Sequence, residues 1–281
     1  MVSSNNEQTW TTTPGNPTGT RKFAVAYGGG KFVSMNTAPM GTVGFQSVDG
    51  ATWTTTTVPA GSYYGIAYGS GTFVAVAQTS PTLNTGKVAT SQDGITWADV
   101  TTASSAVLGG QVQWGAVAFG NGKFVAVSLN LGKAAYSTDS GQTWTAVTVG
   151  ANEWRAICYA NSLFVAVAKT GTNRVMTSPD GITWSTPSLP TGADSTGWKG
   201  VAYGAGLFVA INDNNGGVQN NAKQFLTSPD GVTWTYREAG LGSRTYWTTW
   251  SGIAFGNGKF VIVGNSYDSS FSQSADGLVW T

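Results

Sequence analysis

Ser178-Pro179-Asp180-Gly181-Ile182-Thr183-Trp184 is one of six copies of a segment that recurs through this chain of 281 residues. Before each copy come a tight turn and a Phe-Val pair, and the Asp follows that Phe by 15 to 22 positions. The copies recur about every 45 residues, a period that indicates a repeat architecture. The six acidic residues are Asp49, Asp93, Asp139, Asp180, Asp230 and Asp276.

Each repeat reads as four short strands whose connections alternate between constant and variable length. The first β-rich run, as in Val117-Ala118-Phe119, precedes the second, Phe124-Val125, at a constant spacing, and Gly120-Asn121-Gly122 suits a tight hairpin between them. The Trp that ends the repeat precedes the next repeat by a variable 13 to 20 positions. In an antiparallel meander the constant connections lie at one end and the variable ones at the other. The sequence therefore predicts an all-β fold, a six-bladed β-propeller of four-stranded antiparallel blades.

We expect a single domain over residues 1–281, because the repeats follow one another without a linker. Gln8-Thr9-Trp10 is similar to the fourth-strand segment Ala51-Thr52-Trp53, so we expect an N-terminal strand to close the ring. The predicted blades span approximately residues 21–58, 64–102, 114–149, 154–188, 198–237 and 250–281, the last completed by residues 7–13.

One copy of the segment has the full pattern of a known repeat. Ser137-Thr138-Asp139-Ser140-Gly141-Gln142-Thr143-Trp144 resembles the Asp-box, or BNR, repeat of sialidase-like β-propellers, and the other five copies are one residue shorter between Asp and Gly. The resemblance implies that the six Asp residues are structural and lie in a turn away from the substrate face. It is closest in character to non-catalytic propellers of phage particles. The family also contains sialidases, other glycosidases and lectin-like propellers.

Composition argues against several classes of function. Charged residues are 10% of the chain, against a usual value of about 25%, and the net charge is +1 without a run of like charges. We therefore expect no nucleic-acid partner, and no stretch approaches the roughly 20 apolar residues that membrane insertion needs. The chain has no histidine, and its single cysteine, Cys158, aligns with small residues of the other repeats. We predict no cofactor, no metal and no catalytic residue.

The aromatic residues suggest where a partner binds. Most tryptophans fall at fourth-strand positions, and Trp198 and Trp250 fall near the start of a first strand, where they either pack between blades or form a rim. Tyr64 is expected to hold the same place in the second blade. Trp247 has no counterpart in the other repeats and lies in a connection rich in arginine and aromatic residues. The predicted partner-binding residues are Arg237, Arg244, Tyr246, Trp247, Trp198 and Trp250.

These patterns favour a non-catalytic binding or structural propeller. We expect a phage virion component, such as a head decoration, fibre or tail module, made in the host cytoplasm and presenting its variable loops to virion proteins or a cell-surface glycan. One alternative is a free-standing carbohydrate-binding lectin, either cytoplasmic or non-classically exported. A second is a sialidase-like glycoside hydrolase, although Arg21-Lys22-Phe23-Ala24 replaces the Arg-Ile-Pro motif of that family.

Deletion of residues 1–13 is expected to lower the melting temperature markedly. The reason is that an open blade exposes an unpaired strand edge. Thermal unfolding followed by circular dichroism would measure the effect, and an unchanged melting temperature would contradict the predicted role of the N-terminal strand.

Overall fold

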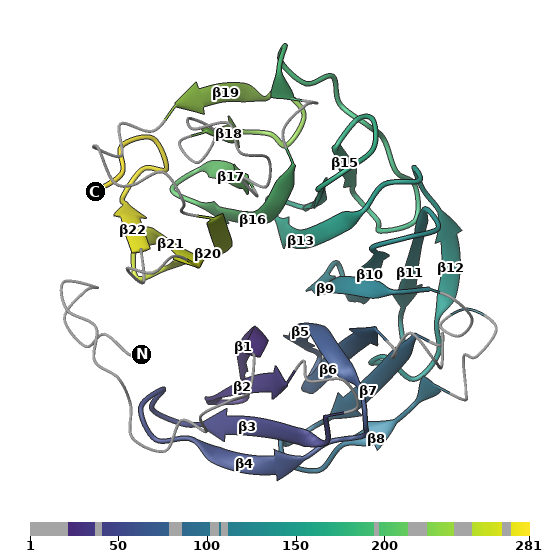
Figure 1. The fold of residues 1–281 in the computed structure, drawn as a ribbon. Helices are drawn as coiled ribbons and strands as arrows, with labels where there is room; N and C mark the ends of the chain where they lie inside the picture. The colour runs from purple at the N-terminus through teal and green to yellow at the C-terminus, as the bar shows by residue number, and fades with distance from the viewer. Residues whose placement is uncertain are drawn as a thin grey trace. The chain divides into compact units, whose positions relative to one another are not determined.

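The computed structural model describes residues 22–36, 41–78, 86–101, 107, 112–193, 197–212, 224–238, 249–265 and 271–281. Its elements are all β-strands, arranged in six antiparallel sheets (Figure 1). The chain divides into two compact units, Met1–Val149 and Gly150–Thr281, each with three sheets. The sheets confirm the predicted fold class, an all-β propeller with six antiparallel blades, which we number 1 to 6 in chain order.

The first unit contains three four-stranded blades, and in each the strands pair in the order in which they follow along the chain. Their bounds are β1 (Lys22–Gly28), β2 (Lys31–Asn36), β3 (Val43–Ser47) and β4 (Thr54–Thr57) in blade 1; β5 (Ser62–Gly69), β6 (Thr72–Gln78), β7 (Lys87–Ser91) and β8 (Ala98–Asp99) in blade 2; β9 (Trp114–Gly120), β10 (Lys123–Ser128), β11 (Lys133–Ser137) and β12 (Thr145–Thr148) in blade 3.

The second unit has one four-stranded blade between two three-stranded ones. Their bounds are β13 (Trp154–Ala160), β14 (Leu163–Ala168) and β15 (Val175–Ser178) in blade 4; β16 (Trp198–Gly204), β17 (Leu207–Asn212), β18 (Gln224–Ser228) and β19 (Thr235–Glu238) in blade 5; β20 (Thr249–Gly256), β21 (Lys259–Asn265) and β22 (Phe271–Ser274) in blade 6. In blade 4 a single bridge between Thr177 and Ser185 takes the place of a fourth strand. Pro187 and Pro190 follow this bridge, and proline lacks the N–H that a continuing strand would need.

The first and second strands of each blade form a hairpin that the sequence specifies locally. In blade 3 the turn residues Asn121 and Gly122 have φ values of 46° and 70°, a conformation that Asn and Gly tolerate best. Every first strand also has a register shift near its start. Tyr63, and not Tyr64 as expected, lies at the position that Trp154 and Trp198 occupy in their blades, because it stands four residues before Ala67 as Trp198 stands four before Ala202.

At three of the four interfaces between neighbouring blades within a unit, a glycine of one blade meets an aromatic ring of the next, whereas blade 4 has Ala160 at the place of the glycine. A Cβ atom added to Gly28 would lie 2.0 Å from Cγ of Tyr68, and one added to Gly69 would lie 2.0 Å from Cγ of Phe119. In the second unit, Gly204 and Phe255 repeat this contact at 2.1 Å. The ring of one blade thus occupies the space that the missing side chain leaves in the blade before it. This explains why a glycine follows the aromatic residue in most first strands, as Gly120 follows Phe119. The first strands of neighbouring blades consequently lie side by side (Figure 1).

The predicted closing strand, residues 7–13, lies outside the described residues, so ring closure and the single-domain assignment stay predictions. At the other terminus, Thr281 exchanges two backbone hydrogen bonds with Gln273 of β22, at 2.9 and 3.0 Å. Within the described part of the chain we found no helix of the length and hydropathy needed to cross a bilayer.

Substitution of Gly69 by alanine is expected to destabilise the protein by about 1–3 kcal/mol, because the new methyl group would overlap the ring of Phe119. Gly252→Ala is the matched control, since its Cβ would meet nothing closer than 3.9 Å. Urea unfolding of both variants would measure the difference. Equal stability of the two variants would show that the contact between glycine and ring does not hold the blades together.

Candidate functional site

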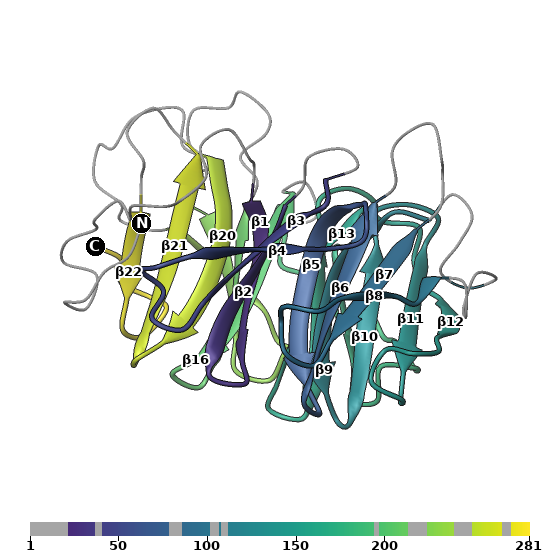
Figure 2. The ribbon, with the colours of Figure 1, turned by 90° about the horizontal axis from the view of Figure 1, so that it is seen from below.

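Each blade of the second unit has two chemically different ends. Tight hairpins, such as Asn161-Ser162 between β13 and β14, share one end with the Asp-containing turns, and we call this the turn end. The connection between the second and third strands, as in residues 169–174, lies at the opposite, variable end. In Figure 2 the hairpin between β20 and β21 lies at the lower edge of the unit. The Asp residues of the repeats are therefore a strand length away from the variable connections.

The Asp carboxylates accept hydrogen bonds from the backbone and the Ser side chains of their own turns. Oδ1 of Asp230 accepts hydrogen bonds from the backbone N–H groups of Val232 (2.8 Å) and Thr233 (2.7 Å) and from Oγ of Ser228 (3.0 Å). Ser228 in turn accepts a hydrogen bond from the N–H of Gly231 at 2.8 Å. The backbone bonds, that of Thr233 first, lower the pKa of Asp230 to about 2, because they stabilise the ionised form. The carboxylate is thus an internal acceptor of the turn.

The same arrangement recurs at the other Asp turns. Backbone hydrogen bonds from Thr52 and Thr96 are the largest causes that lower the pKa of Asp49 and of Asp93, each to about 2. The pKa of Asp180 and that of Asp276 are lowered as well, chiefly by backbone N–H groups. Each of these residues also accepts a hydrogen bond from the Ser two positions earlier.

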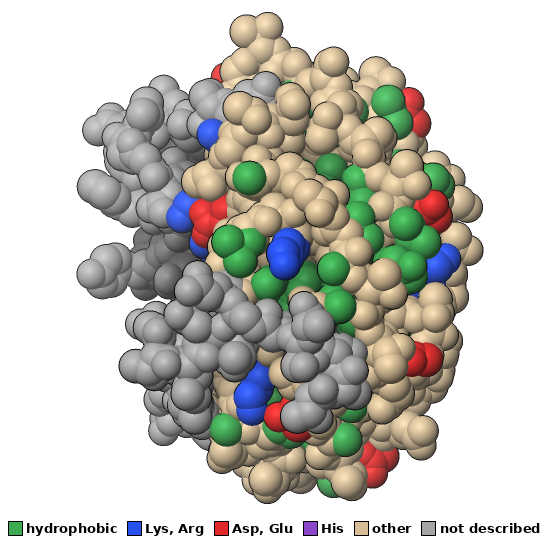
Figure 3. Space-filling view, turned by 90° about the vertical axis from the view of Figure 1, so that its right-hand side faces the viewer, with side chains coloured by type: hydrophobic (Ala, Val, Ile, Leu, Met, Phe, Trp, Pro, Cys, Tyr) green, Lys and Arg blue, Asp and Glu red, His purple; other side chains and the backbone are tan. Residues whose placement is uncertain are grey.

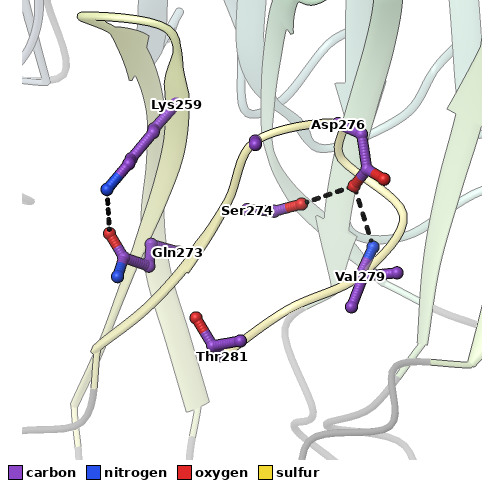
Figure 4. A pocket seen from close by; sticks show the side chains of 7 residues that line it. Lys259, Gln273, Ser274, Asp276, Val279 and Thr281 are labelled. Carbon is purple, nitrogen blue, oxygen red and sulfur yellow. Dashed lines mark hydrogen bonds between the residues drawn. The ribbon is translucent and has the colours of Figure 1, made fainter.

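A pocket of about 290 Å³ lies beside β22 at the turn end (Figure 4). Lys259 donates a hydrogen bond to Oε1 of Gln273 (3.2 Å), and Asp276 accepts bonds from Ser274 and Val279. In blades 4 and 5 the Asp turn of the next blade packs at the corresponding place: Gly231 lies against Leu163, and Gly277 lies against Val209. The pocket therefore lies at a place that, in blades 4 and 5, the Asp turn of the next blade covers.

The structure buries two of the predicted partner-binding residues. Trp198 has no exposed surface, donates a hydrogen bond from Nε1 to the carbonyl of Ala193 (3.2 Å) and meets the ring of Tyr236 edge-on. Trp250 is 4% exposed and belongs to the core that Phe260 and Trp280 share. Of the two alternatives for these tryptophans, burial favours packing between blades over a rim on which a sugar could stack.

Of the other four predicted partner-binding residues, the structure describes only Arg237. Arg237 lies in β19, half-buried, and its Nε donates a hydrogen bond to Oγ1 of Thr227 at 2.7 Å. Arg244, Tyr246 and Trp247 lie outside the described residues, so their role stays a prediction.

A rigid turn at the variable end of blade 4 was not predicted. Asn152 is 5% exposed, and its Nδ2 donates hydrogen bonds to the carbonyls of Thr172 (2.7 Å) and Asn173 (3.2 Å). Gly171 has a φ of 100° and leaves no room for a Cβ atom, which would lie 2.0 Å from Oδ1 of Asn152. Arg174 donates from Nε to the carbonyl of Gly171 (2.9 Å). Sequence spacing could not identify Asn152, because its partners are about 20 positions further along the chain.

Four described cationic residues lie toward the variable end of blades 4 and 5. Arg155 lies at the register shift of β13 and forms an ion pair with Glu153. Lys199 lies at the equivalent shift of β16, the neighbouring first strand. Between them, the N–H of Lys169 donates to the carbonyl of Glu153 (2.9 Å). The stem of Lys169 packs against Gly197 of blade 5, whose Cβ would lie 3.3 Å from it. We call Arg155, Lys169, Arg174 and Lys199 the cationic end.

This arrangement can hold a partner by charge and shape. Among the described residues no group of three His, Cys, Asp or Glu side chains is placed to bind a metal ion. Burial raises the pKa of the Cys158 thiol to about 12, so little thiolate forms at neutral pH. On the face shown in Figure 3, uncharged polar surface predominates and charged side chains are scattered.

Comparison with known proteins supports the fold alone. No family model matches the chain, and no curated protein matches it in sequence. The solved structures that it resembles include an inactive virginiamycin B lyase from Staphylococcus aureus with quinupristin, at 10% identity and a TM-score of 0.65 over 90% of this chain and 84% of that one. YCF48 bound to D1 peptide matches at 16% identity and a TM-score of 0.60, over 88% and 75% of the two chains. The propeller domain of Cps50 (Swd1) from Myceliophteria thermophila matches at 10% identity and 0.60, over 90% and 82%.

The stability of the protein is expected to fall as the pH is lowered from about 4 to about 2, because the Asp turns contribute while they are ionised. A carboxyl group with a pKa below its unfolded value stabilises the fold above the unfolded pKa, and this stability is lost on protonation. Asp230→Asn should show a lower melting temperature at neutral pH and a smaller further loss in acid. Glu238→Gln, which removes an exposed carboxylate from the same blade, is the control and should follow the parent protein. Identical acid profiles for all three proteins would contradict the assignment.

Proposed function

We propose that this chain is a non-catalytic binding propeller, a component of a virion, that holds a partner protein at its variable end. The observation that carries the proposal is the turn at residues 169–174, which buried Asn152 fixes beside the cationic end. A preformed surface of this kind gains affinity because little ordering is needed when the partner binds. The variable end is also where the connections between strands differ among the repeats.

The hydrogen bonds that the Asp residues accept within their own turns support a binding role. The carboxylates of Asp180, Asp230 and Asp276 accept hydrogen bonds within their own turns, at the end opposite the variable connections. Glycoside hydrolysis needs two carboxyl groups about 5–10 Å apart that face the substrate. Glu153, the described carboxylate nearest the rigid turn, is paired with Arg155.

The choice of a protein partner over a glycan follows from the buried aromatic residues. Sugar rings stack on exposed aromatic faces, whereas Trp154 and Trp198 at the variable end of the second unit have no exposed surface. YCF48, which this chain resembles in fold, was solved with a peptide of D1. The virion assignment rests on the sequence, with its low charge, its richness in small polar residues and its resemblance to propellers of phage particles. A cell-surface glycan remains the alternative partner, and Trp247 is an expected contact for either partner.

Immunogold labelling of purified particles from the source, with antibodies against this chain, tests the virion assignment. Gold on the particle surface is the expected result. Two results together would overturn the proposal. The antibodies would detect the chain only in the soluble fraction, and the purified chain would hydrolyse a substrate of a glycoside panel.

Trp247→Ala is expected to weaken attachment to the partner while the melting temperature changes little. Trp198→Ala is the contrasting variant, because loss of a fully buried indole should cost about 3–5 kcal/mol of stability. Co-sedimentation of each variant with particles, alongside thermal unfolding, would measure the two effects. A Trp247→Ala variant that unfolds as easily as Trp198→Ala would show that Trp247 is part of a local core.

A further inference from the structure

We infer that Leu131, in the turn between β10 and β11, is a contact for the partner protein, which encloses this side chain in an apolar pocket of its own. The inference rests on the proposed function and adds a contact made by the first unit. It follows from the backbone conformation of Leu131, from the exposure of its side chain and from the hydrogen bonds that hold the turn.

The backbone of Leu131 is left-handed, with a φ of 64°. This region is unfavourable for a branched side chain, because its Cβ atom comes too close to the backbone carbonyl oxygen. Every other described residue with a positive φ is Gly, Asn, Ser or Ala. In blade 4, Asn173 occupies the corresponding place, two residues before the third strand, with a φ of 51°. Leu131 thus stands where blade 4 has a residue that tolerates this conformation.

The side chain of Leu131 lies outside the core. It is 55% exposed, and the core that blades 2 and 3 share contains Phe124 and Trp144 but not this leucine. An exposed aliphatic side chain alone is common on protein surfaces. At Leu131, however, the exposure coincides with an unfavourable backbone conformation. Backbone strain of this kind is concentrated at functional positions, where binding and not folding decides the residue.

The turn that carries the leucine is held from both sides. The carbonyl of Gln113 accepts a hydrogen bond from the N–H of Leu129 (2.7 Å), and the N–H of Gln113 donates to Oδ1 of Asn130 (2.8 Å). On the other side, the N–H of Val149 donates to the carbonyl of Gly132 at 2.9 Å. These bonds connect the turn to the residues before β9 and after β12, so the leucine is in position before a partner arrives. Positioning a contact in advance reduces the entropy that is lost on binding.

The surroundings of Leu131 indicate the chemistry of the partner. Gln113 is exposed and Asn130 is half-buried, so uncharged amide groups accompany the apolar side chain. An apolar centre with a polar rim is the usual anatomy of a contact between proteins. A pocket lined by apolar side chains is a feature of a protein and not of a glycan. The occupant is therefore a protein with an apolar pocket for one leucine side chain.

Leu131→Asn tests the inference through two measurements. Its melting temperature should rise by about 2 °C, because asparagine tolerates a left-handed backbone. Its co-sedimentation with particles assembled without this chain should be weakened about tenfold, because the apolar contact is lost. Leu131→Met keeps an apolar side chain at the same place and should behave like the parent protein in both measurements. Val48→Asn, which removes a 74% exposed aliphatic side chain from the Asp turn of blade 1, is the control and should bind like the parent protein.

A lower melting temperature of Leu131→Asn would show that the leucine packs within its own chain, and unchanged co-sedimentation would show that it is not a contact. Either result overturns the inference. Self-association of the parent protein that Leu131→Asn abolishes, measured by sedimentation velocity, would also overturn it, because the occupant would be a second copy of this chain. If gold labels the particles and Leu131→Asn binds them like the parent protein, the inference fails while the proposed function stands. If the parent protein itself does not bind the particles, both fail.

Discussion

Within each unit, the packing of one blade against the blade before it is the constraint on which the rest of the structure depends. An aromatic ring of one blade fills the place above a glycine of the preceding blade, as Tyr68 does above Gly28. The Asp turn of the same blade then lies against the second strand of its neighbour, where Gly94 meets Val33 and Lys31 donates a hydrogen bond to the carbonyl of Asp93. At these positions a Cβ atom would meet the neighbouring blade at 2.0 Å for Gly28 and 2.7 Å for Gly94, although blade 4 has Ala160 at the place of Gly28.

This constraint divides the blade into a part that must repeat and a part that is free to vary. The turn end carries the hairpins, which are constant in length, and the Asp turns, which differ by no more than one residue among the repeats. The carboxylate of Asp230 there accepts hydrogen bonds from the backbone of its own turn. The variable end bears no such requirement, so residues that serve a partner can accumulate there.

In the second unit the variable end carries a turn held by hydrogen bonds and several cationic side chains. Asn152 holds the turn at residues 169–174, and the register shifts of β13 and β16 place Arg155 and Lys199 on adjacent strands. The tryptophans that precede these two cations are buried and anchor the strands to the core.

The sequence by itself determined the number of blades, the order of the strands and the place of the Asp residues in turns. These features depend on short spacings between residues, and the spacings recur six times along the chain. It could not decide whether Trp198 and Trp250 are exposed, since an indole at a strand entrance can point toward a rim or into the core. It also gave no sign of Asn152, or of the neighbourhood of Arg155, Lys169 and Lys199. Those depend on long-range contacts between separate repeats, which only the tertiary structure brings together.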